Sequence, residues 1–530
     1  MNRGEYYLRS NVLVEPLVDR WYAWAHLIPP ATAARNITER HLRIMDSYIK
    51  APHAHAAAVK NPKFQGGPFV DFDASRVDEV KALRDRIRSQ REHLLCLSQA
   101  LADLDAMLQK NATGHSLEPL YDQVPEPLRG YVELVYDLNN RPTFRLLEAL
   151  LYRSKYYDRS MQTLLLSIIT GDDRPFVLST PRLTNSLNLE WAVPFGSEAV
   201  DCLFELKVRP ARYPEIKELL EVPDEKDAIL RSLLTEDPAP PYVPYTGRGA
   251  RWRYFGHACI LLETKGVSIL LDPVLSYTYE TNISRYTYDD LPDKIDYVLI
   301  THNHQDHVLM ETLLQIRRRI GTIVVPQSVS GALQDPSLKL LLKHCGFRNV
   351  VEVADFDEFV SDTVTITALP FIGEHADLNI ASKAAYHVRV NGHTLLFAAD
   401  SCNIDPRVYE HVYPEIGDIE VLFLGMECDG APMSWIYGPL LTKKLERSMD
   451  HSRRLAGSNY ERAIRMVDQF RCKEVYVYAM GQEPWCNHVM KIKYTEQSNP
   501  IIHSNRLIET CKQRSIIAER LFGEKEIFLT

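Results

Sequence analysis

The apolar positions in the first half of the chain follow a seven-residue repeat over residues 75–108. This spacing is typical of a helix that buries one stripe of side chains. It predicts one long helix from Ser75, with Ser75 and Asp78 as a capping pair at its start. The stripe can pack inside its own domain or can also pair with a second subunit, and the pattern leaves both open. Its members are Leu83, Ile87, Leu94, Leu97, Leu101, Leu104 and Leu108.

Less regular patterns fill the rest of this half. Residues 117–157 are expected to form helices broken at several prolines, and residues 210–234 are again helical in pattern. Residues 176–178 and 199–207 look like strands. Residues 1–70 show no pattern that assigns an element. Because this half contains no cluster of catalytic side chains, we expect it to serve docking, oligomerisation or closure of a site.

A proline-rich segment, residues 238–244, separates the two halves, because four prolines in seven residues cannot continue a helix or a central strand. We therefore predict two domains, residues 1–245 and 246–530. The first is expected to be a mainly helical α+β domain, and in the second, strands alternate with helices as in an α/β fold. Strands are expected at residues 251–254, 260–264, 267–271, 295–300, 322–325, 350–353, 363–368, 386–390, 393–398, 419–424 and 474–478, and helices at 309–320, 337–345 and 453–470.

Composition narrows the class of protein. With 530 residues, 45% of them hydrophobic, the chain is too long for one compact core. A net charge of −9 argues against general nucleic-acid binding. The nine cysteines are never spaced C-x-x-C, which fits a reducing cytoplasm. Residues 1–11 lack the apolar core of a signal peptide, and no apolar run reaches the roughly 18 residues of a membrane span. We expect a soluble, cytoplasmic protein.

The candidate chemistry centres on four side chains in the pattern H-x-H-x-D-H, namely His302, His304, Asp306 and His307. They lie between a predicted strand and a predicted helix, where a turn can aim several side chains at one point. Imidazole and carboxylate groups are the usual ligands of zinc, iron and manganese. We expect His302 and His304 to reach one metal ion, and Asp306 and His307 a second.

This motif resembles the signature of the metallo-β-lactamase superfamily, and the resemblance extends from about residue 251 onward. It implies an αββα sandwich with a dinuclear metal site at the edge of the sheets. It also implies an aspartate that bridges the two ions, and Asp400 fits because it follows an apolar strand. His257, in an early turn, either faces the metal pocket or is a structural histidine.

The remaining ligand positions depart from the usual superfamily pattern. Where a histidine is normal, Glu374 and His375 stand side by side. Neighbours in an extended segment point to opposite faces, so only one is expected to bind. The late strand ends in Ala479 instead of histidine. Glu427 follows another strand, where it is either a ligand or a solvated loop glutamate. Carboxylate in place of imidazole favours iron or manganese over zinc and suits oxygen chemistry better than hydrolysis.

A closer resemblance covers essentially the whole chain. The length, the helical first half, the motif, Glu374 and Asp400 resemble a small family of di-iron β-hydroxylases, typified by that of chloramphenicol biosynthesis. The resemblance implies that His302, His304, Glu374 and Asp400 surround one iron. Asp306, His307 and Asp400 would surround the other, with Glu427 as an additional ligand.

This resemblance also implies the reaction and the partners. The family uses an oxo-bridged di-iron cluster and O₂ to hydroxylate the β-carbon of an aminoacyl group in natural-product biosynthesis. That group is held as a thioester on a peptidyl carrier domain of a nonribosomal peptide synthetase. The implied partners are the carrier domain, an external reductase as electron donor, and a second copy of the chain bound through the N-terminal domain.

Three other functions compete with this one. A dinuclear zinc or manganese hydrolase of a phosphodiester, lactone or thioester would use His375, not Glu374, as a ligand. A flavodi-iron reductase would have glutamate in place of His304 and a flavin domain. A non-catalytic interaction protein would not need so complete a set of ligands. Metal analysis separates the di-iron enzyme from these alternatives.

Overall fold

The computed structural model describes residues 4–361 and 363–530, and its later half contains two seven-stranded sheets. In spatial order, the first sheet consists of β15 (Val350–Val353), β14 (Ile320–Pro326), β13 (Ile295–Leu299), β12 (Ser268–Leu271), β11 (Cys259–Glu263), β10 (Ala250–Gly256) and β25 (Lys525–Leu529). The second consists of β16 (Glu358–Val360), β17 (Val364–Leu369), β18 (Ala385–Val390), β19 (His393–Phe397), β20 (Val421–Gly425), β23 (Glu474–Tyr478) and β24 (Ile517–Arg520).

Apolar side chains on both faces of each sheet create the sandwich. One cluster, including Trp252, Phe397 and Phe423, lies between the sheets. A second fills the space between the second sheet and helices α12 (Arg407–Ile416), α15 (Tyr460–Gln469) and α17 (Asn499–Gln513). A third lies under α10 (Met310–Ile316) and α11 (Leu338–His344) on the first sheet. The predicted αββα architecture and the strands expected in it are confirmed.

The N-terminal half is a mainly helical α+β region, as predicted. Its largest sheet is antiparallel, in the order β3 (Trp21–Tyr22), β2 (Val12–Val18), β6 (Gln162–Ile168) and β7 (Asn188–Ala192). Smaller strands are β1 (Glu5–Leu8), β8 (Ala211–Arg212) and β9 (Leu234–Thr235). Helices include α1 (Pro30–Asn36), α2 (Leu42–Lys50), α3 (Pro52–Lys60), α8 (Tyr213–Leu219) and α9 (Asp227–Ser232).

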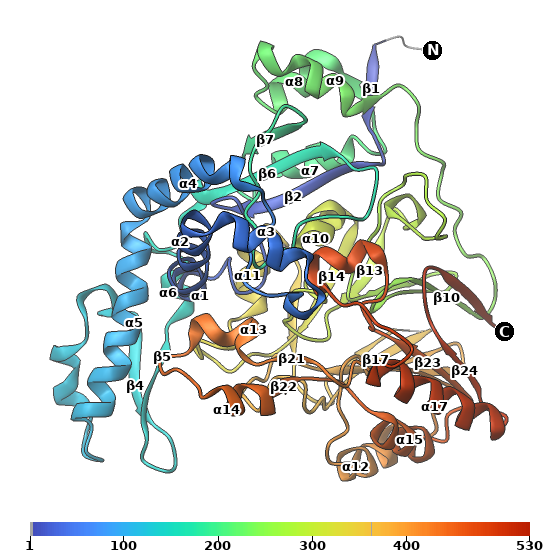
Figure 1. Cartoon of the computed structure of the whole chain (residues 1–530). Helices are drawn as coiled ribbons and strands as arrows, with labels where there is room; N and C mark the ends of the chain where they lie inside the picture. The colour runs from blue at the N-terminus through green and yellow to red at the C-terminus, as the bar shows by residue number, and fades with distance from the viewer. Residues whose placement is uncertain (1–3, 362) are drawn as a thin grey trace.

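This half packs directly on the metal-motif side of the sandwich. One hydrophobic cluster runs from Leu8 in β1 through Leu313 in α10 to Val489, so the two halves share a core. Figure 1 shows the blue and green N-terminal half above and to the left of the yellow and red half, with α10 below β2 and β6. The helix that follows the motif is thus covered by N-terminal residues and not by solvent.

The predicted helix from Ser75 is two helices, α4 (Val77–Gln90) and α5 (Glu92–Asn111). The break falls at Arg91, whose backbone leaves the helical region while its guanidinium binds the carboxylates of Asp19 and Asp158 at 2.9 Å each. A 3₁₀ turn, residues 74–76, leads into α4, and Asp73, not Ser75, caps that turn. All seven members of the apolar stripe are buried within this chain, so the stripe packs inside its own chain.

The helices predicted over residues 117–157 are mostly absent. After two short 3₁₀ turns, β4 (Val132–Tyr136) and β5 (Pro142–Leu146) form an antiparallel hairpin, followed by the four-residue helix α6 (Glu148–Leu151). The Asp137 side chain closes the hairpin by accepting two backbone hydrogen bonds of 2.8 Å, with Asn140 at φ +57°. Turn chemistry therefore outweighs the helical pattern here.

Three further predictions are wrong for local reasons. Residues 199–207 form a helix, α7 (Glu198–Glu205), because Ser197 caps its first turn, and residues 176–178 form a turn and not a strand. The helix expected from residue 453 begins at Tyr460, where the Asn459 side chain accepts the N–H of Arg462 at 3.1 Å. A short apolar run fits a strand and a buried helix equally well, so the capping residue decides which of the two forms. No helix among the described residues is long and apolar enough to cross a membrane.

Candidate metal centre

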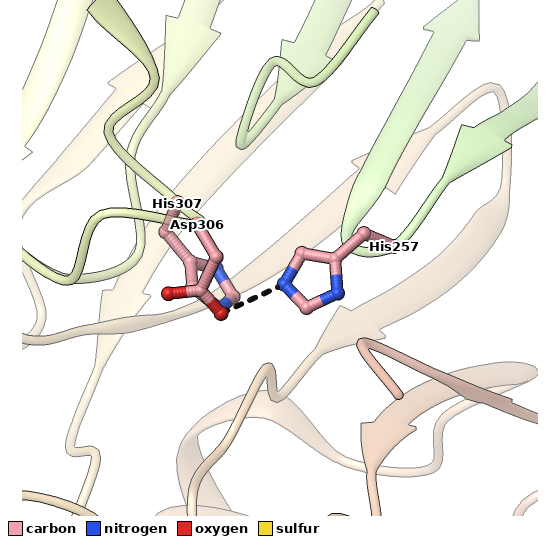
Figure 2. Close-up of side chains that lie close together, drawn as sticks. All are labelled: His257, Asp306 and His307. Carbon is pink, nitrogen blue, oxygen red and sulfur yellow. Dashed lines mark hydrogen bonds and ion pairs between the residues drawn. The ribbon is translucent and has the colours of Figure 1, made fainter. Parts of the chain in front are cut away.

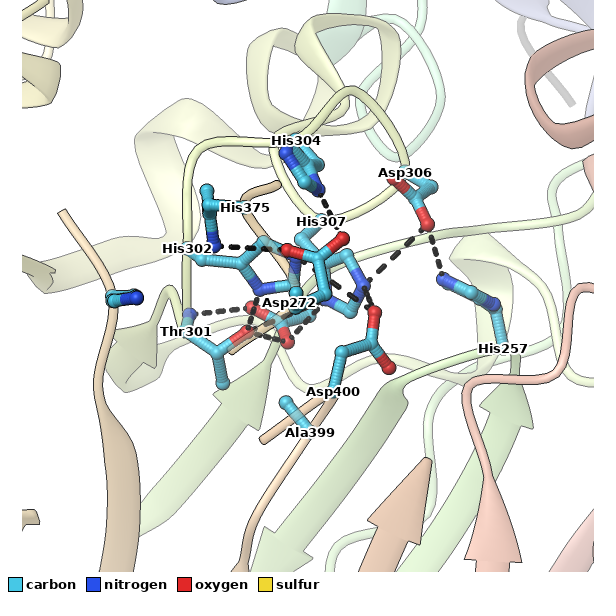
Figure 3. Close-up of polar contacts among 12 residues, drawn as sticks. His257, Asp272, Thr301, His302, His304, Asp306, His307, His375, Ala399 and Asp400 are labelled. Carbon is cyan, nitrogen blue, oxygen red and sulfur yellow. Dashed lines mark hydrogen bonds and ion pairs between the residues drawn. The ribbon is translucent and has the colours of Figure 1, made fainter. Parts of the chain in front are cut away.

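The candidate centre lies where parallel strands of both sheets end. The loop of the H-x-H-x-D-H motif leaves β13, Asp272 leaves β12, Asp400 follows β19 and Glu427 follows β20. Carboxyl ends of parallel strands meet at one edge, which is the usual place for a site in α/β folds. All four motif side chains are buried. Figure 3 shows how they converge with Asp400 and His257.

Asp272 organises the motif loop from below. One carboxylate oxygen accepts the Thr301 backbone N–H at 2.8 Å. The other accepts the Thr301 hydroxyl at 2.6 Å and lies 2.8 Å from His307 Nδ1. A carboxylate on Nδ1 holds the ring so that Nε2 points into the centre. Asp272 is fully buried, and the sequence gives no signal for its role, because it only follows the strand predicted over residues 267–271.

The first group of possible ligands is His302, His304 and Glu374, whose nearest nitrogen and oxygen atoms lie within 4.8 Å of one another. His304 Nδ1 is 2.7 Å from Glu374 Oε1, and His302 Nε2 is 3.7 Å from Glu374 Oε2. On its other side, His304 Nε2 is 3.0 Å from the Tyr437 hydroxyl. Tyr437 therefore holds the His304 ring with Nδ1 toward Glu374.

The segment that carries Glu374 is not extended, which corrects the expectation that Glu374 and His375 point to opposite faces. Gly373, Glu374, Ala376 and Asp377 all have positive φ. In this tightly turned backbone, both neighbours face the centre. His375 Nδ1 lies 3.0 Å from Glu374 Oε2, and its ring stacks on His304 with centroids 4.4 Å apart.

A second group is formed by His257, Asp306 and His307, as Figure 2 shows. His257 Nε2 is 3.0 Å from Asp306 Oδ2, so this histidine faces the metal pocket, the first of the two readings left open. Asp306 Oδ2 is 3.5 Å from His307 Nε2. Asp400 connects the two groups, since its Oδ2 lies 3.3 Å from His307 Nε2 and 3.8 Å from His302 Nε2.

A missing side chain at Gly425 makes room for Asp400. A Cβ atom at Gly425 would lie 2.4 Å from Asp400 Oδ1 and 2.8 Å from the Ala399 carbonyl oxygen. Ala399 itself has φ +45°. The position of Asp400 between the two groups therefore requires glycine at the end of β20.

The buried polar atoms of the centre fit metal ions. Several have no hydrogen-bond partner, and each such atom costs about 1–3 kcal/mol unless something binds it. Four of the side chains concerned, those of His302, His307, Glu374 and Asp400, belong to groups whose ligand atoms lie within 4.8 Å of one another, where cations would satisfy them together. The atoms without a partner are His302 Nε2, His307 Nε2, His375 Nε2, Glu374 Oε2 and Asp400 Oδ1.

Comparison with known proteins assigns the family. Residues 7–238 match the di-iron non-heme β-hydroxylase N-terminal domain, and residues 268–475 match the β-lactamase superfamily domain. The chain is 40% identical over 523 residues to the 4-amino-L-phenylalanyl-[CmlP-peptidyl-carrier-protein] 3-hydroxylase of Streptomyces venezuelae, covering 97% of this chain and 98% of that one. The chain belongs to the di-iron β-hydroxylase family.

Solved structures agree with this family. The crystal structure of CmlA, a di-iron β-hydroxylase from Streptomyces venezuelae, has a TM-score of 0.93 at 39% identity over 99% of this chain and 100% of that one. A glutamate-to-aspartate mutant of CmlA gives a TM-score of 0.91. A metal-dependent hydrolase of Bacillus cytotoxicus is 26% identical over 198 residues, which is 34% of this chain and 79% of that one. The family, the enzyme class and the iron cofactor expected from the sequence are confirmed.

The charges of the centre suit this cofactor. Burial lowers the pKa of His302, and neighbouring imidazoles add to this, so the ring is neutral and its lone pair is free to bind. Burial alone would raise the pKa of Glu374, but the imidazoles of His304 and His375 outweigh it and lower the pKa to about 2. The His302 imidazole and the Glu374 carboxylate are thus in their metal-binding forms.

Glu427 lies in the same cavity but outside both groups. The cavity has a volume of about 270 Å³, and Glu427 lines it with Asp400, Glu374 and Asp306. Its Oε2 accepts the Gly430 backbone N–H at 2.5 Å, and burial raises its pKa to about 7. Its role as an iron ligand stays a prediction.

Two aromatic side chains lie next to the centre: Trp435 lines this cavity and Tyr437 contacts His304. Tyr277 instead donates to Glu311 at 2.8 Å, away from the centre.

Proposed function

We propose that this enzyme hydroxylates the β-carbon of an aminoacyl group held as a thioester on a peptidyl carrier domain of a nonribosomal peptide synthetase. The observation that carries the proposal is the position of Glu374, a carboxylate beside His302 and His304. It makes this half of the centre rich in hard oxygen ligands, which suits iron and O₂. The whole-length likeness to a hydroxylase named for a carrier-bound aminophenylalanyl substrate supports the choice of substrate class.

Each ligand has a defined place in this proposal. His302, His304, Glu374 and Asp400 would hold one iron. Asp306, His307 and Asp400 would hold the other, with Glu427 as a further ligand. When bound, the iron pair supplies the reduction of O₂ and the oxidation of a C–H bond.

The protein itself orients the ligands and the substrate. Asp272 fixes the His307 ring and Tyr437 fixes the His304 ring, so neither has to reorganise during the reaction. Ile436, Leu455 and Met490 give the cavity an apolar wall that places the amino-acid side chain and excludes water.

We further propose the roles of the two halves and the partners. Residues 1–245 would dock the carrier domain and pair two chains, and residues 246–530 would perform the chemistry. Because the apolar stripe of α4 and α5 is buried in its own chain, a homodimer would use other surfaces. An external reductase would supply electrons. A cytoplasmic location fits nine free cysteines.

The test is to give reduced, iron-loaded enzyme and O₂ a set of aromatic amino acids, 4-amino-L-phenylalanine included, each both free and loaded on a carrier domain. We expect a product 16 Da heavier, hydroxylated at the β-carbon, from one loaded carrier and far less from the same free amino acid, because tethering raises effective concentration. Equal turnover of the free amino acid would refute the tethered substrate. Hydrolysis of the thioester without oxygenation would favour the hydrolase.

A further inference from the structure

Three cavities meet at Gly66. The metal cavity described above includes Gln65, Gly66 and Lys491 in its wall. A cavity of about 460 Å³, here called the arginine cavity, is lined by Gly66, Arg40 and Arg43. A cavity of about 110 Å³, here called the lysine cavity, is lined by Gln65, Gly66 and the lysines at 60, 491 and 493. Either outer cavity is a possible entrance to the irons.

The wall between the metal cavity and the arginine cavity is fixed. It includes the Trp435 indole, whose Nε1 donates to the Gly66 carbonyl oxygen at 2.8 Å and whose ring stacks on Phe176 at 5.5 Å. Arg40 donates to the Trp435 carbonyl oxygen at 2.6 Å. Opening this wall would break all three contacts. The cations that line the arginine cavity already have partners, because Arg43 forms an ion pair with Glu39.

The wall between the metal cavity and the lysine cavity is looser. The two cavities share Gln65, Gly66 and Lys491 in their linings, and Gln65 and Lys491 are half-buried. Within residues 4–361 and 363–530, neither side chain has a hydrogen bond or an ion pair. The same holds for Lys60 and Lys493, which are exposed at the outer end. One carboxylate, Asp71, lines this cavity against three ammonium groups.

We propose that the lysine cavity admits the phosphopantetheine arm of the carrier domain, with Lys60, Lys491 and Lys493 binding its phosphodiester. This rests on the proposed function, which requires such an arm to reach the irons. The arm is an unbranched chain with two amides, which suits a narrow passage, and the Gln65 amide can pair with them as it moves aside. Its phosphodiester stays next to the carrier surface, where ammonium groups with no other partner are available. Phe64, half exposed on the same rim, offers an apolar contact to the carrier domain.

The experiment measures binding, so it does not depend on turnover. Iron-loaded enzyme is titrated with 4′-phosphopantetheine and with pantetheine, which lacks the phosphate, and heat is measured. We expect the phosphate to tighten binding by about tenfold, as charge-assisted hydrogen bonds do. The double variant Lys491→Gln/Lys493→Gln should lose this difference while its affinity for pantetheine stays unchanged. Lys491→Arg/Lys493→Arg should retain it.

Arg43→Gln is the matched control, because it removes a cation from the other entrance. This variant should show the same phosphate-dependent difference in affinity as the unaltered enzyme. Iron content and circular dichroism equal to those of the unaltered enzyme should show that all variants fold. Three results would overturn the proposal: equal affinity for the two arms, no binding of the phosphorylated arm at millimolar concentration, or loss of the difference in Arg43→Gln alone. Phosphate-dependent binding without hydroxylation of any loaded carrier would instead reject the proposed reaction and leave the anion site standing.

Discussion

Arg174 Nη2 lies 2.6 Å from Glu311 Oε2, a fully buried ion pair that joins the N-terminal half to the helix after the metal motif. The same guanidinium binds Glu15 of β2 at 2.8 Å. Hydroxyl groups of Tyr22 and Tyr277 donate to Glu311 from two sides, at 2.9 and 2.8 Å. The N-terminal half therefore fixes α10, and with it the loop that presents His302 to His307.

The first prediction concerns this ion pair. Arg174→Met should lower the free energy of unfolding by about 3–5 kcal/mol, because Glu311 would be left as a buried charge without a cation. It should also lower the iron content, because α10 anchors the motif loop. Denaturant unfolding and iron analysis measure the two effects. Arg318→Met is the control, since its exposed pair with Glu205 is worth at most about 1 kcal/mol. If Arg174→Met lowers the free energy of unfolding no more than the control does, the ion-pair network does not stabilise the fold.

The second prediction concerns Gly425. In Gly425→Ala, the new methyl group would meet both Asp400 and the Ala399 backbone, so the bridging carboxylate must move. We expect loss of iron and of hydroxylation in a protein that still folds, measured by metal analysis and circular dichroism. Gly266→Ala is a suitable control, because a Cβ there meets nothing within 4 Å. Normal iron content in Gly425→Ala would show that Asp400 tolerates displacement.

The sequence predicts those parts of the fold and the site that depend on local patterns, and it misses those that depend on contacts between distant residues. The motif and the strands around it follow from local patterns, since clustered metal ligands and buried β-branched runs are recognisable in one dimension. Asp400 follows only from the family resemblance, which calls for an aspartate at the end of that strand. Asp272 and Tyr437 are not recognisable in this way, because their roles come from contacts 35 and 133 residues away along the chain. A lone aspartate at a strand end or a lone tyrosine carries no periodic signal.

Backbone conformation explains the other misreadings. In an extended segment, Glu374 and His375 would point to opposite faces. Here three non-glycine residues at positive φ turn the segment, so that both side chains face the centre. Such conformations are rare, and tertiary contacts impose them. The apolar stripe predicts a buried face but not what covers it, and its interruption at Arg91 depends on the distant partners Asp19 and Asp158.

The third prediction separates Glu374 from His375. Glu374→Ala should lose at least one iron and all hydroxylation, because it removes an oxygen 2.7 Å from His304 Nδ1. His375→Ala should keep both irons but lower the rate, because His375 positions the Glu374 carboxylate from 3.0 Å. Iron analysis and the absorption spectrum of the oxidised enzyme give the readout. The reverse pattern, with iron lost only in His375→Ala, would return the centre to the ligand set of a hydrolase.

The last prediction concerns Asp272, the carboxylate beneath the motif. It accepts hydrogen bonds from the Thr301 backbone, the Thr301 hydroxyl and the His307 ring. In Asp272→Asn one of the two terminal atoms becomes an N–H₂ group. If that group faces His307, the ring loses the acceptor that holds Nδ1. If it faces the Thr301 backbone, two donors meet in a buried space. Either orientation should weaken iron binding about 10–100-fold, the usual cost of losing such a partner.

The affinity for ferrous iron is measured by competition with a chelator. Asp293→Asn, the same substitution at an exposed position, is the matched control. Unchanged iron affinity in Asp272→Asn would mean that the protein can hold His307 without the carboxylate. Weakened affinity together with a normal fold by circular dichroism would instead assign Asp272 a positioning role. The distinction matters because Asp272 leaves β12 and the motif leaves β13, two paired parallel strands. Their register alone brings the carboxylate under the histidine, so a slip of one residue would separate them.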